Sequence, residues 1–302
     1  MDYPKVFVVI LNWNGLKDTV ECLESVFKLD YPKFKVLVVD NGSRDDSVQL
    51  IRGKYKDVTL IENTENLGFA GGNNVGIRYA LDNSAEYVWL LNNDTAVATD
   101  SLSKLVVTAE SSPGIALVSP VIYYFDDPKQ IQFAGSNVKW KDLSFIYPDL
   151  SSETIRPDFQ VGKNVTLWGT ALLVKRSCIV KIGLLKEEYF AYWEDLEYSL
   201  RSLNSGLRNV VCTSAQITHK IPLPGSVKFT RSKHHIYFIV RNRYFLGKEY
   251  LKGIASFNYK RNLFADLVKY VAFYREAGNK DYLEACLDGA WHGFLGPRGD
   301  LP

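Results

Sequence analysis

Residues 36–43 read Val-Leu-Val-Val-Asp-Asn-Gly-Ser, an apolar run that ends on an aspartate and a turn. Consecutive aliphatic side chains predict a strand that is buried on both faces. Similar apolar runs occur at Val6–Leu11, Val58–Ile61 and Tyr87–Leu91. Segments with helical periodicity separate these runs, at Leu16–Lys28, Ser47–Lys54 and Gly72–Leu81. The alternation predicts an α/β fold with a mostly parallel sheet flanked by helices.

The remaining chain is less regular. We expect a helix and a strand over Ser101–Val118, and then loops and short antiparallel strands over Tyr123–Lys163. A strand over Thr166–Val174 and a turn near Lys181–Gly183 should follow. A helix is expected over Glu194–Ser205, ending before Gly206. Val210 and Val211 indicate another short strand, and a helical region closes the chain. We therefore expect a first domain over residues 1–225 and a helical C-terminal region over residues 226–302.

Composition excludes several classes of protein. The 302 residues are 46% hydrophobic and 23% charged, which is typical of a globular chain and not of a disordered or fibrous one. No apolar run approaches the roughly 18–20 residues of a membrane-spanning helix, and no secretion signal is apparent. The cysteines Cys22, Cys178, Cys212 and Cys286 are widely spaced. They predict reduced thiols in a cytoplasmic protein.

Polar clusters follow the expected strands, at residues 12–15, 40–43, 66–73 and 92–94. In a parallel sheet these clusters converge at the carboxyl ends of the strands, where ligands bind. An aspartate such as Asp40 can accept hydrogen bonds from a ribose or a base, and glycine-rich turns let backbone amides approach phosphates. The clusters therefore predict a nucleotide site, although Asp40 alone also fits an ordinary turn.

The chain has neither the GxGxxG fingerprint nor a P-loop, which argues against a dehydrogenase or a P-loop NTPase. A diphosphate would have to be neutralised differently. Asp94, at a strand end, suits a divalent cation that bridges phosphate oxygens, and its alternative is a simple turn residue.

Five segments together resemble a known family. They are Val-Val-Asp-Asn-Gly-Ser (38–43), Asn-Leu-Gly-Phe-Ala-Gly-Gly-Asn (66–73), Leu-Asn-Asn-Asp (91–94), Trp-Gly-Thr-Ala (168–171) and Trp-Glu-Asp-Leu-Glu-Tyr-Ser-Leu-Arg (193–201). In this order and spacing they resemble family 2 glycosyltransferases of the GT-A fold, especially a rhamnosyltransferase-like branch. The resemblance covers about residues 5–245.

The resemblance implies roles for individual residues. The nucleotide sugar would be bound by Leu11, Asn12, Trp13, Asp40, Asn66, Gly68, Gly72, Asn73, Asn93 and Asp94. Asp94 would take the last position of the DxD metal motif and hold Mg²⁺ or Mn²⁺. Asn92 stands where the first aspartate is usual, which predicts weaker metal binding. His219 resembles a histidine that adds a metal ligand, and a structural histidine is the alternative.

The implied reaction moves a sugar from a nucleoside diphosphate to an acceptor hydroxyl with inversion. A carboxylate must take the hydroxyl proton, and the resemblance assigns this to Asp195. Glu194 and Asp195 also fit a helix start, where negative charge complements the dipole. Trp168 and Gly169, with Glu194, would line the acceptor or sugar side, or Trp168 could pack in the core.

The expected donor is a dTDP- or UDP-linked sugar, with dTDP-rhamnose first, and the expected acceptor is a polysaccharide or a lipid-linked glycan. Two alternatives stay open. One is a nucleotide-sugar or glycan-binding protein without turnover, suggested by Asn92. The other is a nucleotidyltransferase, which shares the sheet topology and a metal aspartate.

Positive charge concentrates in the C-terminal region. Residues 228–280 hold 12 Lys and Arg against 3 Asp and Glu, whereas the rest holds 24 against 31. Aromatic residues interleave with these cations, which suits anionic lipid headgroups or a phosphorylated acceptor. We expect no nucleic-acid partner. Arg241 could contact a diphosphate. We expect peripheral association with the inner face of the membrane. The alternatives are a helical cap with aromatic core residues and, for Arg241, a solvated helix face.

Overall fold

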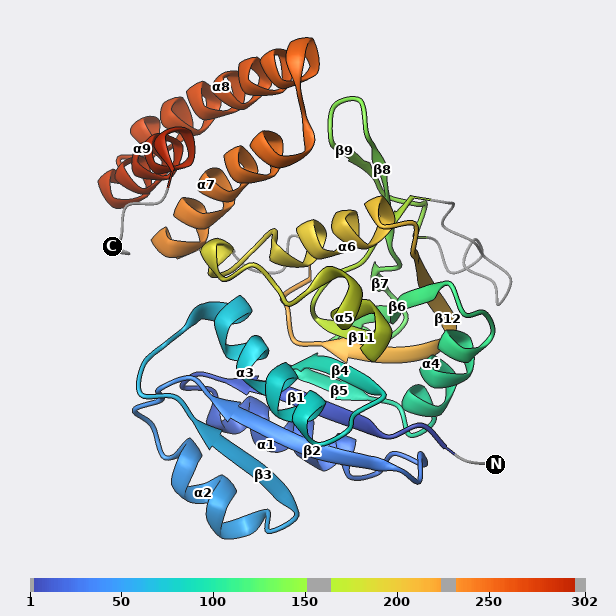
Figure 1. Cartoon of the computed structure of the whole chain (residues 1–302). Coiled ribbons are helices and arrows are strands. Elements are labelled where there is room, and N and C mark those ends of the chain that lie inside the picture. Colours follow the sequence, from blue (N-terminus) through green and yellow to red (C-terminus); the bar gives the residue numbers. More distant parts are fainter. Residues whose placement is uncertain (1–2, 151–163, 224–231, 297–302) are drawn as a thin grey trace.

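The structure is a computed structural model that describes residues 3–150, 164–223 and 232–296. Its first half is the predicted parallel sheet, with neighbouring strands in the order β3-β2-β1-β4 (Figure 1). These strands span Val6–Asn12 (β1), Phe34–Asp40 (β2), Val58–Glu62 (β3) and Tyr87–Asn92 (β4). In the register, Asn12 lies opposite Asp40 and Leu11 lies opposite Asn92, so the polar strand ends do meet at one edge.

The second half continues the same sheet in the order β4-β11-β6-β12-β5. β11 runs antiparallel to both of its neighbours, β4 and β6, whereas β12 pairs parallel with β6. The strands are β5 (Thr95–Val97), β6 (Ile115–Tyr124), β7 (Ile131–Phe133), β11 (Ala171–Lys175) and β12 (Arg208–His219). A second small sheet contains β8 (Ser136–Lys139), β9 (Ser144–Ile146) and β10 (Val165–Thr166).

Helices cover both faces of the large sheet because side chains alternate along its strands. Val8 and Ile10 of β1 pack in one core with α1, α2 and α4, and Phe7 and Val9 pack in the other with α3, α5 and α6. The helices span Leu16–Val26 (α1), Ser47–Lys54 (α2), Gly68–Asp82 (α3), Ser101–Glu110 (α4), Arg176–Ile182 (α5) and Glu194–Asn204 (α6). The structure confirms the predicted mixed α/β architecture.

The strand that we expected over Thr166–Val174 is broken. β10 ends at Thr166 and β11 begins at Ala171, with Trp168 and Gly169 in the connection. Backbone amides of this connection bond to α6 and not to a sheet ladder: Leu167 N donates to Ser199 Oγ, and Gly169 N donates to Asp195. The helix α5, which was not expected, ends at Ile182, and the chain turns at Gly183 near the expected position. The expected short strand at Val210 belongs to the 12-residue β12.

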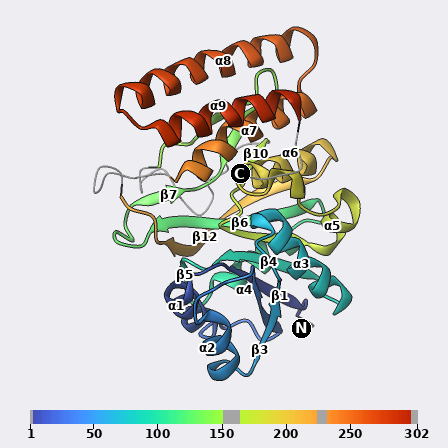
Figure 2. The same cartoon turned by 90° about the vertical axis from the view of Figure 1, so that its left-hand side faces the viewer.

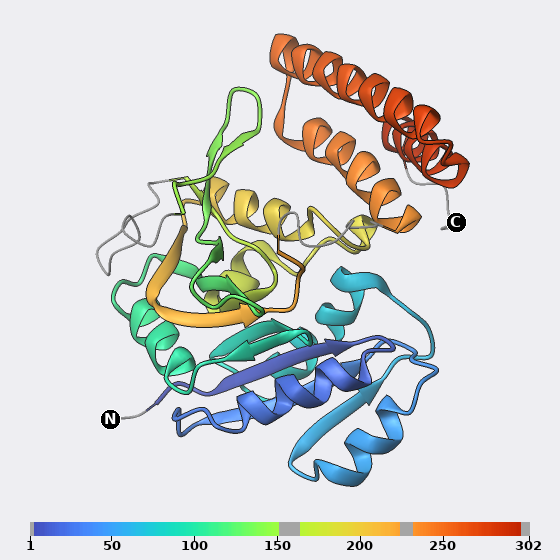
Figure 3. The ribbon, with the colours of Figure 1, turned by 180° about the vertical axis from the view of Figure 1, so that it is seen from behind.

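The C-terminal region is helical, as expected, with α7 (Lys233–Tyr250), α8 (Gly253–Glu276) and α9 (Lys280–Leu295). Viewed from behind, α7 lies beside the β8–β9 hairpin (Figure 3), and Leu246 and Leu251 share a core with Val138 and Leu200. α8 is the outermost helix (Figure 2). The proposed boundary at residues 225 and 226 falls in a segment outside the described residues. No helix in the described ranges is long and apolar enough to cross a membrane.

Candidate active site

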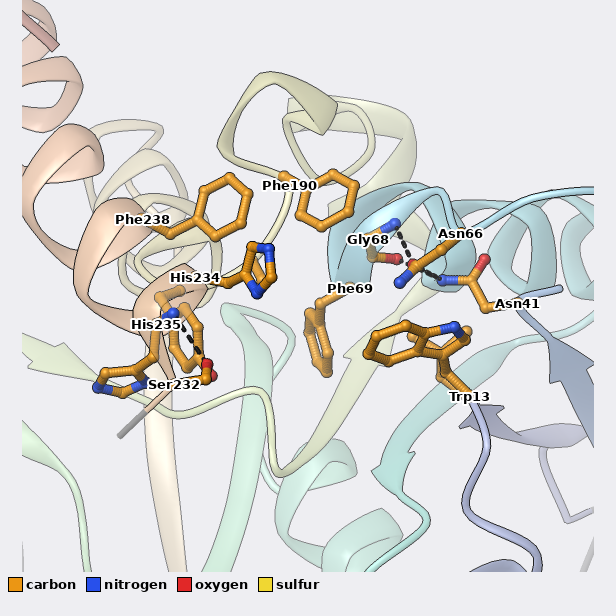
Figure 4. Close-up of a pocket in the computed structure, with 13 residues that line it drawn as sticks. Trp13, Asn41, Asn66, Gly68, Phe69, Phe190, Ser232, His234, His235 and Phe238 are labelled. Atoms are coloured by element: carbon orange, nitrogen blue, oxygen red, sulfur yellow. Dashed lines mark hydrogen bonds between the residues drawn. The ribbon is translucent and has the colours of Figure 1, made fainter. Parts of the chain in front are cut away.

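A cavity of about 640 Å³ lies where the carboxyl ends of β1 and β2 meet the start of α3 and the start of α7 (Figure 4). Four of the residues that the sequence singled out line it: Leu11, Trp13, Asn66 and Gly68. The sequence analysis did not select the other lining residues, which are Asn41, Phe69, Phe190, Ala191, Tyr192, Ser232, His234, His235 and Phe238. One wall therefore comes from the C-terminal helices, and the remaining walls come from the strand ends and from the loop before α6.

Asp40 lies behind this cavity. It is buried, and it accepts hydrogen bonds from Asn12 Nδ2 at 2.7 Å and from the backbone amide of Ser43 at 2.8 Å. The second bond is the turn interaction that the sequence offered as an alternative. Asn12 in turn accepts from Thr19 and lies 3.4 Å from Asn93 Nδ2, so a chain of hydrogen bonds joins the ends of β1, β2 and β4.

Asn41, which follows Asp40 directly, connects β2 to α3. Its Nδ2 donates to Asn66 Oδ1 at 2.8 Å and to the carbonyl of Gly68 at 3.0 Å, and its Oδ1 accepts from Leu67 N. The sequence signal for this role was its place inside the strand-end turn. Asn41 fixes the cavity wall on which Trp13 and Asn66 are displayed.

The glycines of the 66–73 segment shape the same wall. Gly68 has a φ of +73°, and a Cβ atom there would lie 2.5 Å from the carbonyl oxygen of Phe190. Gly72 lies against the side chain of Leu11, and Asn73 is buried with its amide donating to Phe69 O. Gly72 and Asn73 therefore do not line the cavity, and their positions explain the close packing of α3.

Asp94 lies between β4 and β5, and it is close to His219 at the end of β12. Asp94 Oδ1 lies 3.1 Å from His219 Nε2, and β12 places His219 opposite Thr95 of β5. The ring Nδ1 of His219 is 3.0 Å from Gln132 Oε1, so each ring nitrogen faces an acceptor oxygen. A cation at Nε2 would require the ring proton on Nδ1, where Gln132 Oε1 can accept a hydrogen bond from it. The sequence analysis missed Gln132, because only the packing of β7 against β6 brings it to His219.

This pair fits a divalent cation. Within the described residues, Asp94 Oδ1 is buried and no donor bonds to it, and two acceptors that face one another favour a cation between them. The same residues contain no cluster of three or more His, Cys, Asp or Glu side chains that could hold a metal alone. Mg²⁺ commonly takes one or two protein ligands and completes its shell with water and substrate phosphates. A shared protein and diphosphate site is therefore chemically reasonable.

Asp195 is the second residue of α6 and lies beside the cavity. It accepts from Gly169 N at 2.8 Å and from its neighbour Leu196 N at 2.7 Å. A Cβ atom on Gly169 would lie 3.0 Å from the Phe69 ring and 3.3 Å from Asp195 Cβ, so Asp195 lies next to a ring that lines the cavity. Burial raises the pKa of the Asp195 carboxyl, and the backbone amides of Gly169 and Leu196 oppose that rise.

Glu194, the preceding residue, is only 4% exposed. No hydrogen-bond partner for its Oε2 occurs in the portion of the chain that the structure describes. Burial, followed by the negative charge of Asp195, raises the pKa of Glu194 well above its ordinary value. The two carboxyl groups differ because more backbone amides stabilise the charged form of Asp195, and because the negative charge of Asp195 adds to the effect of burial on Glu194.

Contacts within the protein account for the positions of Trp168 and Arg241. Trp168 is half-buried and stacks on Phe133, with ring centroids 4.0 Å apart, as the core alternative expected. Arg241 is buried and donates to the carbonyls of Glu188 and Tyr189, at the short 3₁₀ turn Glu187–Tyr189. It therefore does not lie on a solvated helix face. Phosphate contact by Arg241 remains a prediction, and these bonds favour a structural role.

Comparison with known proteins identifies the family. The model of the family described as glycosyl transferase family 2 matches residues 7–182. The low-salt glycan biosynthesis hexosyltransferase Agl10 of Haloferax volcanii is 23% identical over 88% of this chain and 87% of its own length. The dTDP-rhamnosyl transferase RfbF of Shigella flexneri is 23% identical, over 72% of this chain and 69% of that protein.

Solved structures agree on the fold. The mannosyltransferase PcManGT from Pyrobaculum calidifontis, determined with GDP-Man and Mn²⁺, has a TM-score of 0.59 and 20% identity, covering 99% of this chain and 77% of that one. GalNAc-T7, determined with UDP, GalNAc and Mn²⁺, also has a TM-score of 0.59, with 15% identity over 91% of this chain and 58% of its own. The fold is GT-A, as the sequence indicated. The chain is a glycosyltransferase, and it belongs to glycosyl transferase family 2.

Proposed function

We propose that this enzyme transfers a sugar from a nucleoside diphosphate sugar to a glycan or lipid-linked acceptor, with inversion and with Asp195 as the base. The position of Asp195 carries the proposal: the carboxylate is partly buried, fixed by two backbone amides and adjacent to Phe69 of the cavity. The rhamnosyl transferase RfbF among the relatives supports dTDP-rhamnose as the first donor to test.

In the proposed step, Asp195 accepts the proton of the acceptor hydroxyl while that oxygen forms a bond to the anomeric carbon. The bond from this carbon to the diphosphate breaks on the opposite side, and the diphosphate leaves with the bonding electrons. A base is more effective when its pKa approaches the working pH. The raised pKa of Asp195 therefore suits this role, provided that the group is ionised when the acceptor binds.

Asp94 and His219 would hold a divalent cation, with Gln132 keeping the imidazole lone pair directed at it. When bound, the cation would offset the charge of the departing diphosphate. The Mn²⁺ named with PcManGT and GalNAc-T7 supports this assignment. Because Asn92 replaces a carboxylate, we propose that the donor diphosphate contributes much of the coordination.

The nucleoside would lie at the strand-end wall, on Leu11, Trp13 and Asn66, above the buried Asp40. Asn12, Asn93, Gly68, Gly72 and Asn73 would act by shaping that wall. The acceptor would approach past Phe69 toward Asp195, with Gly169, Glu194 and the stacked Trp168 below it.

The proposed acceptor predicts where in the cell the enzyme acts. A lipid-linked glycan would bring the enzyme to a membrane surface, and we propose the inner face of the cell membrane. The cysteines, all of them free and buried, fit a reducing compartment.

The test is transfer by wild type, Asp195→Asn and Asp57→Asn with a panel of dTDP-, UDP- and GDP-sugars, with and without Mn²⁺. We expect Asp195→Asn to bind donor normally and to lose transfer, whereas the exposed Asp57→Asn behaves as wild type. Release of nucleoside diphosphate supports glycosyl transfer, and release of pyrophosphate would indicate a nucleotidyltransferase. Donor binding without turnover in wild type would indicate a binding protein.

A further inference from the structure

Large apolar side chains gather on the solvent side of α8. Phe257 and Phe264 are 63% and 64% exposed, and Ile254 and Val268 are exposed as well. Their spacings of three, seven and four residues place them on one stripe of the helix. At 1.5 Å per residue the stripe runs for roughly 21 Å. Exposed apolar stripes of this length mark interaction surfaces.

The opposite side of α8 already has its partners. Tyr259 and Leu263 are buried in a core shared with Leu246 of α7 and Leu200 of α6. The helix therefore packs on the enzyme through one face and presents a second apolar face outward, at the position farthest from the sheet (Figure 2). Packing within the described structure does not account for the outer stripe.

Basic side chains accompany the stripe. Lys260, Arg261, Lys269 and Arg275 are exposed on α8. Asp266, an acidic residue of the same helix, is bound by Arg243 of α7 at 2.8 Å. Arg261 lies on the stripe itself, between Phe257 and Phe264 at helical spacing. The surface is thus both apolar and cationic, and it fits a partner that is apolar beneath an anionic layer.

We propose that the outer face of α8 docks on an anionic lipid bilayer. Phe257 and Phe264 would enter the interface between headgroups and acyl chains, and Lys260 and Arg261 would contact lipid phosphates. A second copy of the chain fits less well, because a symmetric pairing of the stripe would bring like charges together.

The structure narrows the surface that the sequence suggested. Tyr237, Phe238, Phe245 and Tyr259 are buried, so these four rings of the basic aromatic region cannot contact lipid. α9 also exposes Trp291 and Phe294, but it carries the exposed carboxylates of Asp281, Glu284 and Asp288, which disfavour an anionic surface. The docking face is therefore assigned to α8 alone.

The proposed function supplies the reason for docking, since a lipid-linked acceptor would lie at the same surface. The measurement is independent of it: full-length protein is sedimented, without donor or acceptor, with vesicles of phosphatidylcholine and phosphatidylglycerol or of phosphatidylcholine alone. We expect binding only to the anionic vesicles, with a loss as salt rises. The double variant Phe257→Ser/Phe264→Ser should bind at least about tenfold more weakly.

Phe273→Ser is the matched control. Phe273 is 63% exposed on the same helix but lies nine residues beyond Phe264, half a turn away from the stripe. It should bind vesicles as wild type does. Lys260→Glu/Arg261→Glu tests the charge contribution without removing an aromatic ring, so a folding failure of the serine variant leaves the proposal testable.

Three results would overturn the proposal: wild type that stays in the supernatant with anionic vesicles at low salt, equal weakening by Phe273→Ser, or a wild-type dimer in solution that the double variant converts to a monomer. Transfer to a soluble acceptor should be unchanged in the double variant. Vesicle binding by a wild type that lacks transfer would refute the proposed function and leave the docking face standing.

Discussion

At the scale of residues, the adjacent carboxyl groups of Glu194 and Asp195 have different surroundings. Asp195 accepts two backbone hydrogen bonds, and Glu194 Oε2 is buried with no partner among the described residues. The first arrangement favours the anion, and the second favours the protonated acid. Glu194 therefore holds a proton under conditions in which an exposed glutamate has lost it.

This difference predicts how stability depends on pH. The folded state raises the pKa of Glu194. Above about pH 4.3 the native protein therefore binds more protons than the unfolded chain. The free energy of unfolding then falls as pH rises through the raised pKa. Glu194→Gln removes that titration. Urea unfolding between pH 5 and pH 8 should show a decline of up to about 1.4 kcal/mol per pH unit in wild type that is reduced in the variant. Equal slopes would contradict the assignment.

Gln132 allows a test of the cation pair. Gln132→Leu removes the acceptor next to Nδ1 of His219, so the tautomer that a cation at Nε2 requires loses its hydrogen-bond partner. We expect Mn²⁺ affinity in the presence of nucleoside diphosphate to fall about 10–100-fold, measured by electron paramagnetic resonance of free Mn²⁺. The exposed Gln130→Leu is the control. Unchanged affinity in Gln132→Leu would separate Gln132 from the metal.

At the scale of elements, the start of α3 depends on one glycine. Gly68 has a positive φ, and its α-carbon faces the carbonyl oxygen of Phe190. The bond from Ala70 N to Phe190 O, at 3.0 Å, joins α3 to the loop that leads into α6. α3 and the loop before α6 thus form one continuous cavity wall.

Gly68→Ala should destabilise the protein by about 1–3 kcal/mol, because alanine is strained at this φ and its Cβ would press on Phe190. Gly53→Ala is the control. Gly53 lies inside α2 with open space around it, so alanine should be neutral or stabilise by up to about 1 kcal/mol. Urea unfolding measures both. A neutral Gly68→Ala would show that the loop at Phe190 moves away without cost.

A comparison of the predicted and the observed strands shows where prediction from the sequence failed. The strands of the first half were recognisable because an apolar run bounded by turns has one stable outcome in a parallel sheet. The segment 166–174 has the same apolar character but breaks at Trp168, because α6 offers its amides better partners in Ser199 and Asp195. Those partners lie about 30 positions away and do not appear in a local pattern.

At the scale of the whole molecule, α7 connects the C-terminal helices to the loop before α6. Asn242 Nδ2 lies 2.8 Å, 2.9 Å and 2.7 Å from the carbonyl oxygens of Tyr189, Ala191 and Tyr192. Arg241 binds the same loop, and Phe238 stacks on Phe190 with ring centroids 4.9 Å apart. The C-terminal region is therefore part of the cavity and not a separate appendage to it.

Asn242→Ala should lower both stability and transfer. The two N–H groups of Asn242 are shared among three loop carbonyls, and the carbonyls of Ala191 and Tyr192 would lose this donor, whereas Tyr189 O keeps its bonds from Arg241 and Ala191. This predicts a loss of about 2–4 kcal/mol in the free energy of unfolding. kcat should fall at temperatures where the variant is still folded, because the loop that precedes Glu194 is no longer held. The exposed Asn262→Ala on α8 is the control. A variant with lowered stability but normal kcat would show that the loop keeps its place without α7.

The sequence by itself determined the parallel sheet, the polar strand ends, the family and the residues to test as base and metal ligand, because each is encoded in a short contiguous pattern. Only the tertiary structure decided that Arg241 is buried, that Gln132 lies beside Nδ1 of His219, that α7 lines the cavity, and that α8 presents an apolar stripe with cations beside it. The physical reason is that burial and hydrogen-bond partners depend on contacts between segments distant in the chain. Composition therefore identified a basic aromatic region, and packing decided which of its side chains remain available to bind.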